Sequence, residues 1–350
     1  MKIAILGDTH FGVRNDLSVF HKSFEKFYTD FIQYLIDNEI KIVFQLGDLF
    51  DRRKYINYYS LSECKRYFFD KLAENNIRLY TLIGNHDIYW RESLEVNAQS
   101  LILGEYTNII AIDKPTTIGF SGDTTSFDFI PWICPENEKE VYDFIKASKS
   151  DICLGHFEIA GFAMYKGMEA HHGLDREMFT KYAHTWSGHY HTRSKKDNIT
   201  YVGTPCEMTW QDAYDPKGFH VFDTGNFTLE FIENPHRIFI RIEYDDENIV
   251  ELDSLDLKDC FVRVVVVAKS DPYKFDQFIQ KLYNKGCYEV KLIEDISEFQ
   301  DGEIGEEIDL EDTMDVLSNY IDTVETDTDK EKVKTFIKTL YVEAINQEVV

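Results

Sequence analysis

RLYTLIGNHD, residues 78–87, joins an apolar run directly to a polar stretch and decides the fold. Its first six residues, 78–83, are typical of a buried strand. A tight turn would explain Gly84 and Asn85, but it would not explain His86 beside them. Amide, imidazole and carboxylate groups bind metal ions, so the stretch predicts a polar site at the end of a strand. Other strands that end in the same way would strengthen this prediction.

Four more polar stretches follow apolar runs, and a glycine begins each of them. They are Gly7-Asp8-Thr9-His10, Gly47-Asp48-Leu49-Phe50-Asp51, Gly155-His156 and Gly188-His189-Tyr190-His191. One such stretch alone is more often a turn or a surface loop. In open α/β sheets, however, the carboxyl ends of the strands meet at one edge, and glycine lets the backbone approach a ligand there. Five stretches in one chain therefore favour a shared site.

The segments between these strands have helical periodicity. Residues 17–38 place large apolar side chains at steps of three and four. Ser60 and Glu63 have the spacing of a capping box, which predicts a helix that begins at Ser60. Strands that alternate with helices indicate an α/β fold with a largely parallel sheet. Beyond residue 105 the chain is richer in strands, and 199–205 and 217–223 are expected to pair with each other.

The C-terminal third differs from the rest. Residues 237–293 have the pattern of a small βαβ-like unit with a helix near 273–285. Residues 294–329 then contain fifteen Asp and Glu but no Lys or Arg, which accounts for over half of the net charge of −26. This imbalance weakens a role on nucleic acid without excluding it, because the acidity is concentrated in one segment. Two helical stretches with one apolar face each lie within 310–345.

Composition restricts the class of protein further. The sequence has no CxxC pair among its six cysteines, so reduced and mostly buried thiols are expected. No apolar run is long enough to span a bilayer, and the start of the chain lacks the pattern of a signal peptide. These features predict a cytoplasmic protein with no membrane partner.

The candidate metal ligands within the five polar stretches are two or three carboxylates, one amide and four imidazoles. Oxygen and nitrogen ligands without thiolates suit Mn²⁺ or Fe²⁺ and disfavour a structural zinc site. So many ligands exceed the needs of one ion and suit two. A pair of ions can hold the attacking and leaving oxygens of a phosphoryl group and provide hydroxide near neutral pH. Phosphoester hydrolysis is the reaction that this set predicts.

The set D-x-H, GD, GNHD, GH and GHxH resembles the calcineurin-like metallophosphoesterase superfamily. Downstream, YVGTP (201–205) and KGFHVFD (217–223) resemble the nuclease subunit of the SbcCD and meiotic-recombination-eleven family. FDFIPWICPEN (127–137) and KTLYVEAINQ (338–347) are most similar to the version in T-even-type tailed phages. The resemblance implies a four-layer α-β-β-α sandwich over 1–230, a small α+β capping and DNA-binding domain over 231–294, and an acidic linker with a C-terminal helical pair over 295–350.

The resemblance also implies roles for single residues. One metal ion would be held by Asp8, His10, Asp48 and His191, and the other by Asp48, Asn85, His156 and His189. The ions would be two Mn²⁺, with Mg²⁺ or Fe²⁺ possible. His86 would protonate the leaving oxygen as general acid. Archaeal members have His at the position of Asp51, whereas Asp51 is expected here to pair with His86 and raise its pKa. The alternative for Asp51 is a helix-start residue without a partner.

Further residues are assigned more loosely. Contacts to DNA phosphate are expected from Arg52, Arg53, Lys54, Arg193, Lys195 and Lys196, unless these side chains only face solvent. His21 is expected at the surface. An exposed or structural role is expected for His171 and His172, with the rim of the active site as the alternative, and a structural role for His184, His220 and His236. The family implies that the terminal helices bind the coiled coil of an SMC-like ATPase, through Leu310, Met314, Leu317, Ile321, Val333, Phe336, Ile337, Leu340 and Tyr341.

The resemblance thus implies a Mn²⁺-dependent exonuclease and endonuclease that acts on double-strand DNA ends as part of an ATP-driven recombination and repair complex. A homodimer is expected from the family. Two alternatives remain open: a phosphoprotein or nucleotide phosphatase, favoured by GDLFDRR (47–53) and the few basic residues, and a non-catalytic scaffold of the ATPase.

Overall fold

The computed structural model describes residues 1–165, 168–170, 172–293, 330 and 333–334, and residues 1–292 form one compact unit. This unit contains two six-stranded sheets. The first has the order β14-β13-β1-β2-β3-β4, and β1 to β4 are parallel. Its strands are β1 (Lys2–Leu6), β2 (Ile42–Gln45), β3 (Arg78–Leu82), β4 (Ile109–Ile112), β13 (Gly218–Asp223) and β14 (Thr228–Glu233).

The second sheet has the order β11-β12-β10-β7-β6-β5, with β6, β7, β10 and β12 parallel. Its strands are β5 (Thr116–Gly119), β6 (Ser126–Ile130), β7 (Ile152–His156), β10 (His184–Gly188), β11 (Ser194–Lys196) and β12 (Ile199–Tyr201). A short hairpin of β8 (Ala163–Tyr165) and β9 (Met168–Glu169) lies apart from both sheets in the hydrogen-bond pattern. Each large sheet therefore has a parallel centre, as the alternation of strands and helices predicts.

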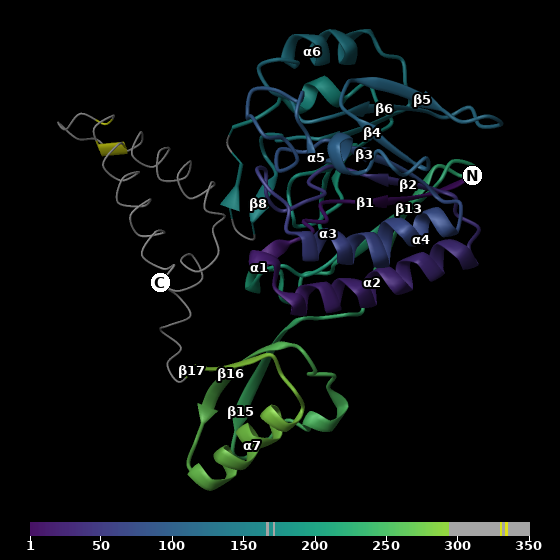
Figure 1. Cartoon of the computed structure of the whole chain (residues 1–350). Coiled ribbons are helices and arrows are strands. Elements are labelled where there is room, and N and C mark those ends of the chain that lie inside the picture. Colours follow the sequence, from purple (N-terminus) through teal and green to yellow (C-terminus); the bar gives the residue numbers. More distant parts are fainter. Residues whose placement is uncertain (166–167, 171, 294–329, 331–332, 335–350) are drawn as a thin grey trace. The chain divides into compact units, whose positions relative to one another are not determined.

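Figure 1 shows the two sheets face to face, with helices on their outer faces. Buried apolar side chains from both sheets pack between them. Alternate residues of β1 divide between two cores: Ile3 and Ile5 pack between the sheets, whereas Ala4 and Leu6 face the helices. The first sheet is covered by α2 (Ser18–Asp37), α3 (Tyr58–Cys64), a π-helical turn (Lys65–Phe69) and α4 (Asp70–Glu74), and the second by α6 (Glu138–Ala147). The expected four-layer α-β-β-α sandwich is confirmed.

Three expectations about local structure are wrong. The helix α3 begins at Tyr58, because the Asn57 side chain accepts from the Tyr59 amide, so Ser60 does not cap it. Segments 199–205 and 217–223 do not pair, since β12 belongs to the second sheet and β13 to the first. His21 is not at the surface: it is 2% exposed, and its ring nitrogens lie 2.7 Å from Ser60 Oγ and 3.2 Å from Tyr67 Oη.

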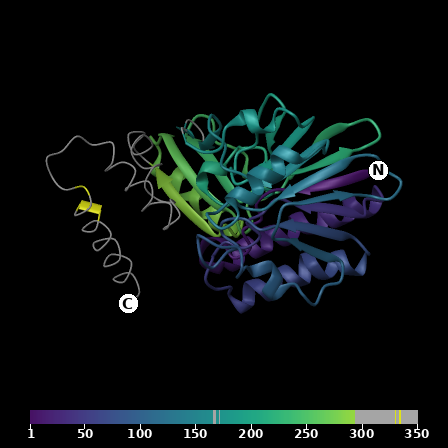
Figure 2. The ribbon, with the colours of Figure 1, turned by 90° about the horizontal axis from the view of Figure 1, so that it is seen from above.

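A third, three-stranded sheet follows the two large ones in the sequence. It consists of β15 (Phe239–Asp245), β16 (Phe261–Ala268) and β17 (Glu289–Ile293), which lie side by side in Figure 2, and α7 (Pro272–Asn284) packs on it. Phe239 and Phe261 join the same core as Phe20 of α2, and Lys22 forms an ion pair with Asp259 at 2.9 Å. The βαβ-like unit is therefore present and is packed against α2.

Several further features can be compared with the sequence. All six cysteines are unpaired; five are buried and Cys287 is half-buried. Within the described residues, no helix is both long and apolar enough to cross a bilayer. Eight of the nine residues expected to bind an ATPase lie outside the described residues, as does His171. The ninth, Val333, is half-buried in a helical turn, and the binding role of all nine stays a prediction.

Candidate metal centre

The carboxyl ends of five strands bring the predicted ligands together. Asp8 and His10 follow β1, Asp48 follows β2, and Asn85 follows β3. From the second sheet, His156 is the last residue of β7, while His189 and His191 follow β10. The ligands thus come from both sheets and meet where the sandwich opens at one edge, as expected for parallel strands.

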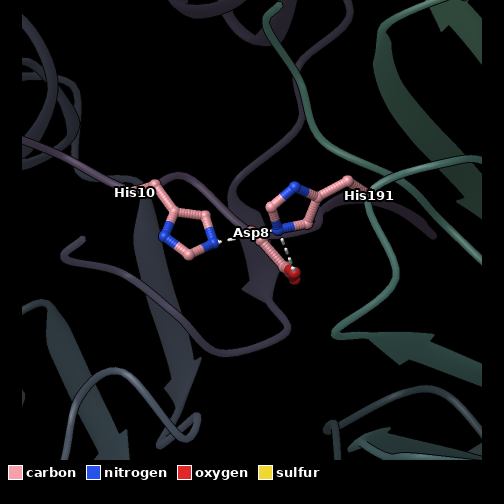
Figure 3. Close-up of side chains that lie close together, drawn as sticks. All are labelled: Asp8, His10 and His191. Carbon is pink, nitrogen blue, oxygen red and sulfur yellow. Dashed lines mark hydrogen bonds and ion pairs between the residues drawn. The ribbon is translucent and has the colours of Figure 1, made fainter. Parts of the chain in front are cut away.

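Asp8, His10 and His191 form a first cluster, which Figure 3 shows in close-up. The Nε2 atoms of His10 and His191 lie 3.1 Å apart, and His191 Nε2 lies 3.7 Å from Asp8 Oδ2. Potential ligand atoms of the three side chains all lie within 4.8 Å of one another. Two facing ring nitrogens beside a carboxylate present lone pairs to a common point, which suits a divalent cation.

A second cluster lies next to the first and is formed by Asp48, His156 and His189. The amide oxygen of Asn85 lies 2.9 Å from His156 Nε2 and 3.1 Å from His189 Nδ1, so Asn85 belongs to this group as well. Asp48 Oδ2 lies 3.2 Å from His156 Nε2 and 3.8 Å from His10 Nε2 in the first cluster. The Asp48 carboxylate therefore lies between the two clusters, where a ligand shared by two ions would be.

Close backbone packing makes this arrangement possible at two glycines. A Cβ atom on Gly84 would lie only 2.2 Å from Asp48 Oδ1, and one on Gly188 only 2.4 Å from Asp8 Oδ1. Any side chain at either position would displace a carboxylate of the site. The ligands also have unusual backbone geometry, since the φ angles of His10, Asp48 and His189 are 42°, 51° and 84°. Left-handed φ angles at non-glycine residues cost free energy and concentrate at functional sites.

The loops after β2 and β3 are joined by Asp87, whose role the sequence did not indicate. The side chain is 1% exposed, and its carboxylate accepts from the amides of Leu49 and Phe50 at 2.9 and 3.2 Å and of Gly84 at 2.8 Å. One side chain thus satisfies three buried backbone donors from two loops. Its place at the end of GNHD, two residues after the candidate ligand Asn85, is the signal that could have found it.

His86 lies beside the clusters and contacts the backbone of Asp51. Its Nδ1 atom lies 2.7 Å from the main-chain carbonyl oxygen of Asp51 and donates to it. This contact fixes the tautomer of His86, because a carbonyl oxygen can only accept a hydrogen bond. The Asp51 carboxylate lies 3.5 Å from Nδ1 of His10, and the charges of His10 and His86 lower the pKa of this carboxyl despite its burial. The pairing of the Asp51 carboxylate with His86 stays a prediction.

Burial and charge determine the protonation of the ligands. Burial lowers the pKa of His191 to about 3, and burial together with the charge of His156 holds the pKa of His189 well below its ordinary value. Both rings are therefore neutral at neutral pH, as metal binding requires. Burial opposes protonation of His10 as well, but Asp51 and Asp48 raise the pKa of His10 to about 10. In the metal-free protein, protons on such rings balance the buried carboxylates.

The candidate DNA contacts are surface or half-buried residues with partners of their own. Arg52 donates to Tyr55 Oη and to Asn15 Oδ1, and it lies 3.7 Å from Asp16 Oδ2. The guanidinium of Arg193 stacks on the ring of Phe231 at 3.9 Å. Lys54, Lys195 and Lys196 are exposed, Arg53 is half-buried, and Lys196 donates to the carbonyl of Gly161. Their contact with DNA stays a prediction.

The remaining histidines and one tryptophan complete the surroundings. His172 is exposed, His220 is buried, and His236 pairs with Asp30 at 2.8 Å. His184 stacks on the neighbouring Trp186, with ring centroids 5.9 Å apart. Trp132, in FDFIPW, was not singled out in the sequence, yet its ring centroid lies 5.3 Å from that of His189 and 5.9 Å from that of His156. It forms an aromatic wall of the second cluster.

Comparisons with known proteins agree with this geometry. A model of the calcineurin-like phosphoesterase family matches residues 1–214, which include every candidate ligand. Exonuclease subunit 1 of Enterobacteria phage T4 is 35% identical over 347 residues, 98% of this chain and 99% of that protein. The DNA double-strand break repair protein Mre11 of Methanocaldococcus jannaschii is 23% identical over 266 residues, 71% of this chain and 70% of that protein. A solved archaeal phosphodiesterase is 15% identical and covers 67% of this chain and 100% of its own, with a TM-score of 0.35, which is too low to place residues.

Proposed function

Because this chain belongs to the calcineurin-like phosphoesterase family, we propose that it is a Mn²⁺-dependent DNA nuclease that hydrolyses phosphodiester bonds at double-strand ends. The observation that supports two-ion chemistry is the Asp48 carboxylate between the two ligand clusters, with Oδ2 3.2 Å from His156 Nε2 and 3.8 Å from His10 Nε2. DNA as the substrate is supported by the names of both relatives, an exonuclease subunit and a break repair protein.

The chain's own residues would act as follows. Asp8, His10 and His191 would hold one ion, Asn85, His156 and His189 the other, and Asp48 both. The ions supply hydroxide near neutral pH and neutralise charge on the phosphate. Asp48 Oδ1 accepts from the His86 amide at 2.8 Å, so the shared ligand also fixes the backbone of the general acid. His86 would then deliver a proton from Nε2 to the leaving oxygen, because its Nδ1 proton is engaged by the Asp51 carbonyl.

The other predicted partners belong to the same proposal. One relative is named as a subunit, and a subunit works with a partner. We propose that the partner of this chain is a coiled-coil ATPase bound through residues 295–350. Residues 231–294 would cap the nuclease domain (1–230) and contact DNA, and two copies of the chain would form a homodimer. The acidic tail would repel the duplex and leave it to the active-site edge.

The decisive experiment measures nucleotide release from a blunt linear duplex by the purified chain with Mn²⁺, Mg²⁺ or a chelator. Chromogenic phosphomonoester and phosphodiester substrates are tested in parallel, and Asp48→Asn, purified identically, controls for contaminating nucleases. Manganese-dependent release that Asp48→Asn lacks, together with diesterase activity, is the expected result. If the chain hydrolyses the phosphomonoester substrate and leaves DNA intact, the proposed function would be that of a phosphatase and not of a nuclease. If the purified chain has neither bound metal nor any of these activities, the remaining hypothesis is a non-catalytic scaffold of the ATPase.

A further inference from the structure

Lys217 is a buried ammonium group close to the first ligand cluster. The residue directly precedes β13 and is 2% exposed. Its Nζ atom donates to three acceptors: Asp212 Oδ1 at 2.6 Å, Asp215 Oδ2 at 2.9 Å and the main-chain carbonyl oxygen of His191 at 3.0 Å. An ammonium group has three N–H donors, so every one of them is engaged.

Burying a charge costs several kcal/mol, and a whole buried ion pair can often be replaced by apolar side chains without loss of stability, whereas removal of one partner alone is strongly destabilising. The two carboxylates offset this cost, but they do not explain why the third donor binds His191. That contact is the only one of the three that is made to a candidate metal ligand. It joins the start of β13 in the first sheet to the segment after β10 in the second.

His191 needs such support more than four of the other candidate ligands do. Asp8, His10, Asp48 and His156 are at most 3% exposed and are held by surrounding atoms, whereas 31% of the His191 side chain is exposed. His191 also lies three residues beyond the end of β10, outside the hydrogen bonds of the sheet. Its carbonyl accepts two hydrogen bonds, from Lys217 Nζ and from the amide of Thr204 at 3.1 Å. Together they fix the peptide plane from which the ring projects.

The position of Lys217 is set independently of the metal centre. Asp212 is 5% exposed, and its Oδ2 atom accepts from the amides of Met208 and Thr209 at 3.0 and 2.8 Å. Asp212 and Thr209 form a capping box on the short 3₁₀ helix Trp210–Asp212. The carboxylate that orients the ammonium is therefore anchored in a rigid turn, and the ammonium in turn holds the His191 carbonyl.

We propose that Lys217 is a positioning residue that holds His191 in place for the metal ion shared with Asp8 and His10. The proposal rests on the two-ion centre proposed above. Groups that orient a metal ligand without touching the metal alter affinity by about 10- to 100-fold. Loss of the Lys217 ammonium should therefore weaken one of two sites by this factor and leave the site of Asn85, His156 and His189 unchanged.

The test compares the full-length wild type with two variants, Lys217→Met and the control Lys149→Met. Lys149 is exposed and lies between α6 and β7. Isothermal titration with Mn²⁺ gives stoichiometry and affinities, and electron paramagnetic resonance distinguishes coupled Mn²⁺ pairs from single ions. Lys217→Met is expected to bind one ion as before and the other about 10- to 100-fold more weakly, with the coupled signal replaced by a six-line spectrum. Lys149→Met should match the wild type.

If Lys217 has a purely structural role, Lys217→Met should lower the unfolding temperature without changing the Mn²⁺ affinity of the site formed by Asp8, His10 and His191. Two ions bound by Lys217→Met at wild-type affinity would therefore overturn the proposal. If the single variant fails to fold, Lys217→Met with Asp212→Asn and Asp215→Asn removes the unpaired carboxylates and is measured in the same way. A wild type that binds no Mn²⁺ pair would overturn the proposed centre as well. A coupled pair in both wild type and variant would overturn only the role of Lys217.

Discussion

The two ring nitrogens of His86 are distinguished by their surroundings. Nδ1 donates to the Asp51 carbonyl at 2.7 Å, so changes in protonation take place at Nε2. The His86 amide is also fixed, through Asp48 Oδ1 at 2.8 Å. A proton donor held at both its backbone and its ring keeps one orientation.

Replacing His86 by Ala should lower kcat for DNA cleavage by about 100- to 10,000-fold, the usual contribution of a general acid. The metal content should stay that of the wild type, because the ring lies outside both ligand clusters. Stopped assays on linear duplex and elemental analysis of the same preparation test both points. A variant that cleaves at the wild-type rate would show that another group protonates the leaving oxygen.

Metal binding should release protons. His10 and His156 have pKa values raised to about 10 and about 9, where burial is outweighed by Asp51 and Asp48 for the first ring and by Asp48 for the second. Both rings are protonated at pH 7 and must lose a proton to bind a cation, so affinity should rise with pH up to about pH 10, the higher of the two pKa values. Titrations with Mn²⁺ in two buffers of different ionisation enthalpy count the protons. Equal heats in both buffers would contradict this assignment.

At the scale of elements, the site depends on hydrogen bonds between the loops that follow β2 and β3. Asp87 connects the loop after β2 with the loop after β3 through three backbone amides. Those loops contain Asp48 and Asn85, one ligand each. The same carboxylate therefore stabilises the fold and sets the distance between two ligands.

Asp87→Ala should lower the free energy of unfolding by about 3 kcal/mol or more, because it leaves three buried amides without acceptors. Asp113→Ala, at an exposed position on the same sheet's edge, should change it by less than about 0.5 kcal/mol. Chemical denaturation of the metal-free proteins gives both values. Equal stability of the two variants would mean that water replaces the carboxylate.

The alternating strands and helices of the first sheet were predictable from the sequence. An apolar run followed by Gly and a polar residue is typical of a buried strand that ends at a site. The strand ends at Asp8, Asp48 and Asn85 lie at one edge for that reason. The pairing of distant strands and the contacts between distant side chains were not predictable. Periodicity does not reveal that β12 and β13 enter different sheets, or that His21 finds Ser60 and Tyr67 in the core. The contact of Asp51 with His10 likewise depends on loop geometry that spacing does not determine.

At the scale of the whole molecule, buried neutral histidine makes stability depend on pH. His220, in β13, is 3% exposed, and burial together with the charge of Arg193 lowers its pKa to about 3. The unfolded chain binds this proton near pH 6.5 and the folded chain does not, so stability is lost as pH falls below 6.5. At pH 5 the loss from this residue is about 2 kcal/mol.

His220→Leu should remove that part of the acid sensitivity. The difference in unfolding free energy between pH 7 and pH 5 is expected to shrink by about 2 kcal/mol relative to the wild type, whatever the variant's stability at pH 7. Urea denaturation at the two pH values measures it. An unchanged difference would mean that His220 titrates normally in the folded protein.

Residues 1–292 form a compact unit with their own cores, so a chain that ends at residue 293 should fold alone. We expect its thermal midpoint to lie within a few degrees of the full chain's and its Mn²⁺-dependent cleavage to persist, while co-purification with a co-expressed coiled-coil ATPase is lost. Calorimetry, the duplex assay and affinity purification test the three parts. Retained ATPase binding would move the partner surface into the first 293 residues.

The order of strands in the first sheet also has a consequence for protein synthesis. β1 is made before the other strands of this sheet, yet one of its neighbours is β13, whose residues 218–223 are made much later. Until then a nascent chain has β1 as an edge strand, open to pairing with other chains. His189 and His191 are also made after β1 to β4, so the ligand set is incomplete until the second sheet is being assembled. A nascent chain therefore has an open edge strand before its metal centre can form.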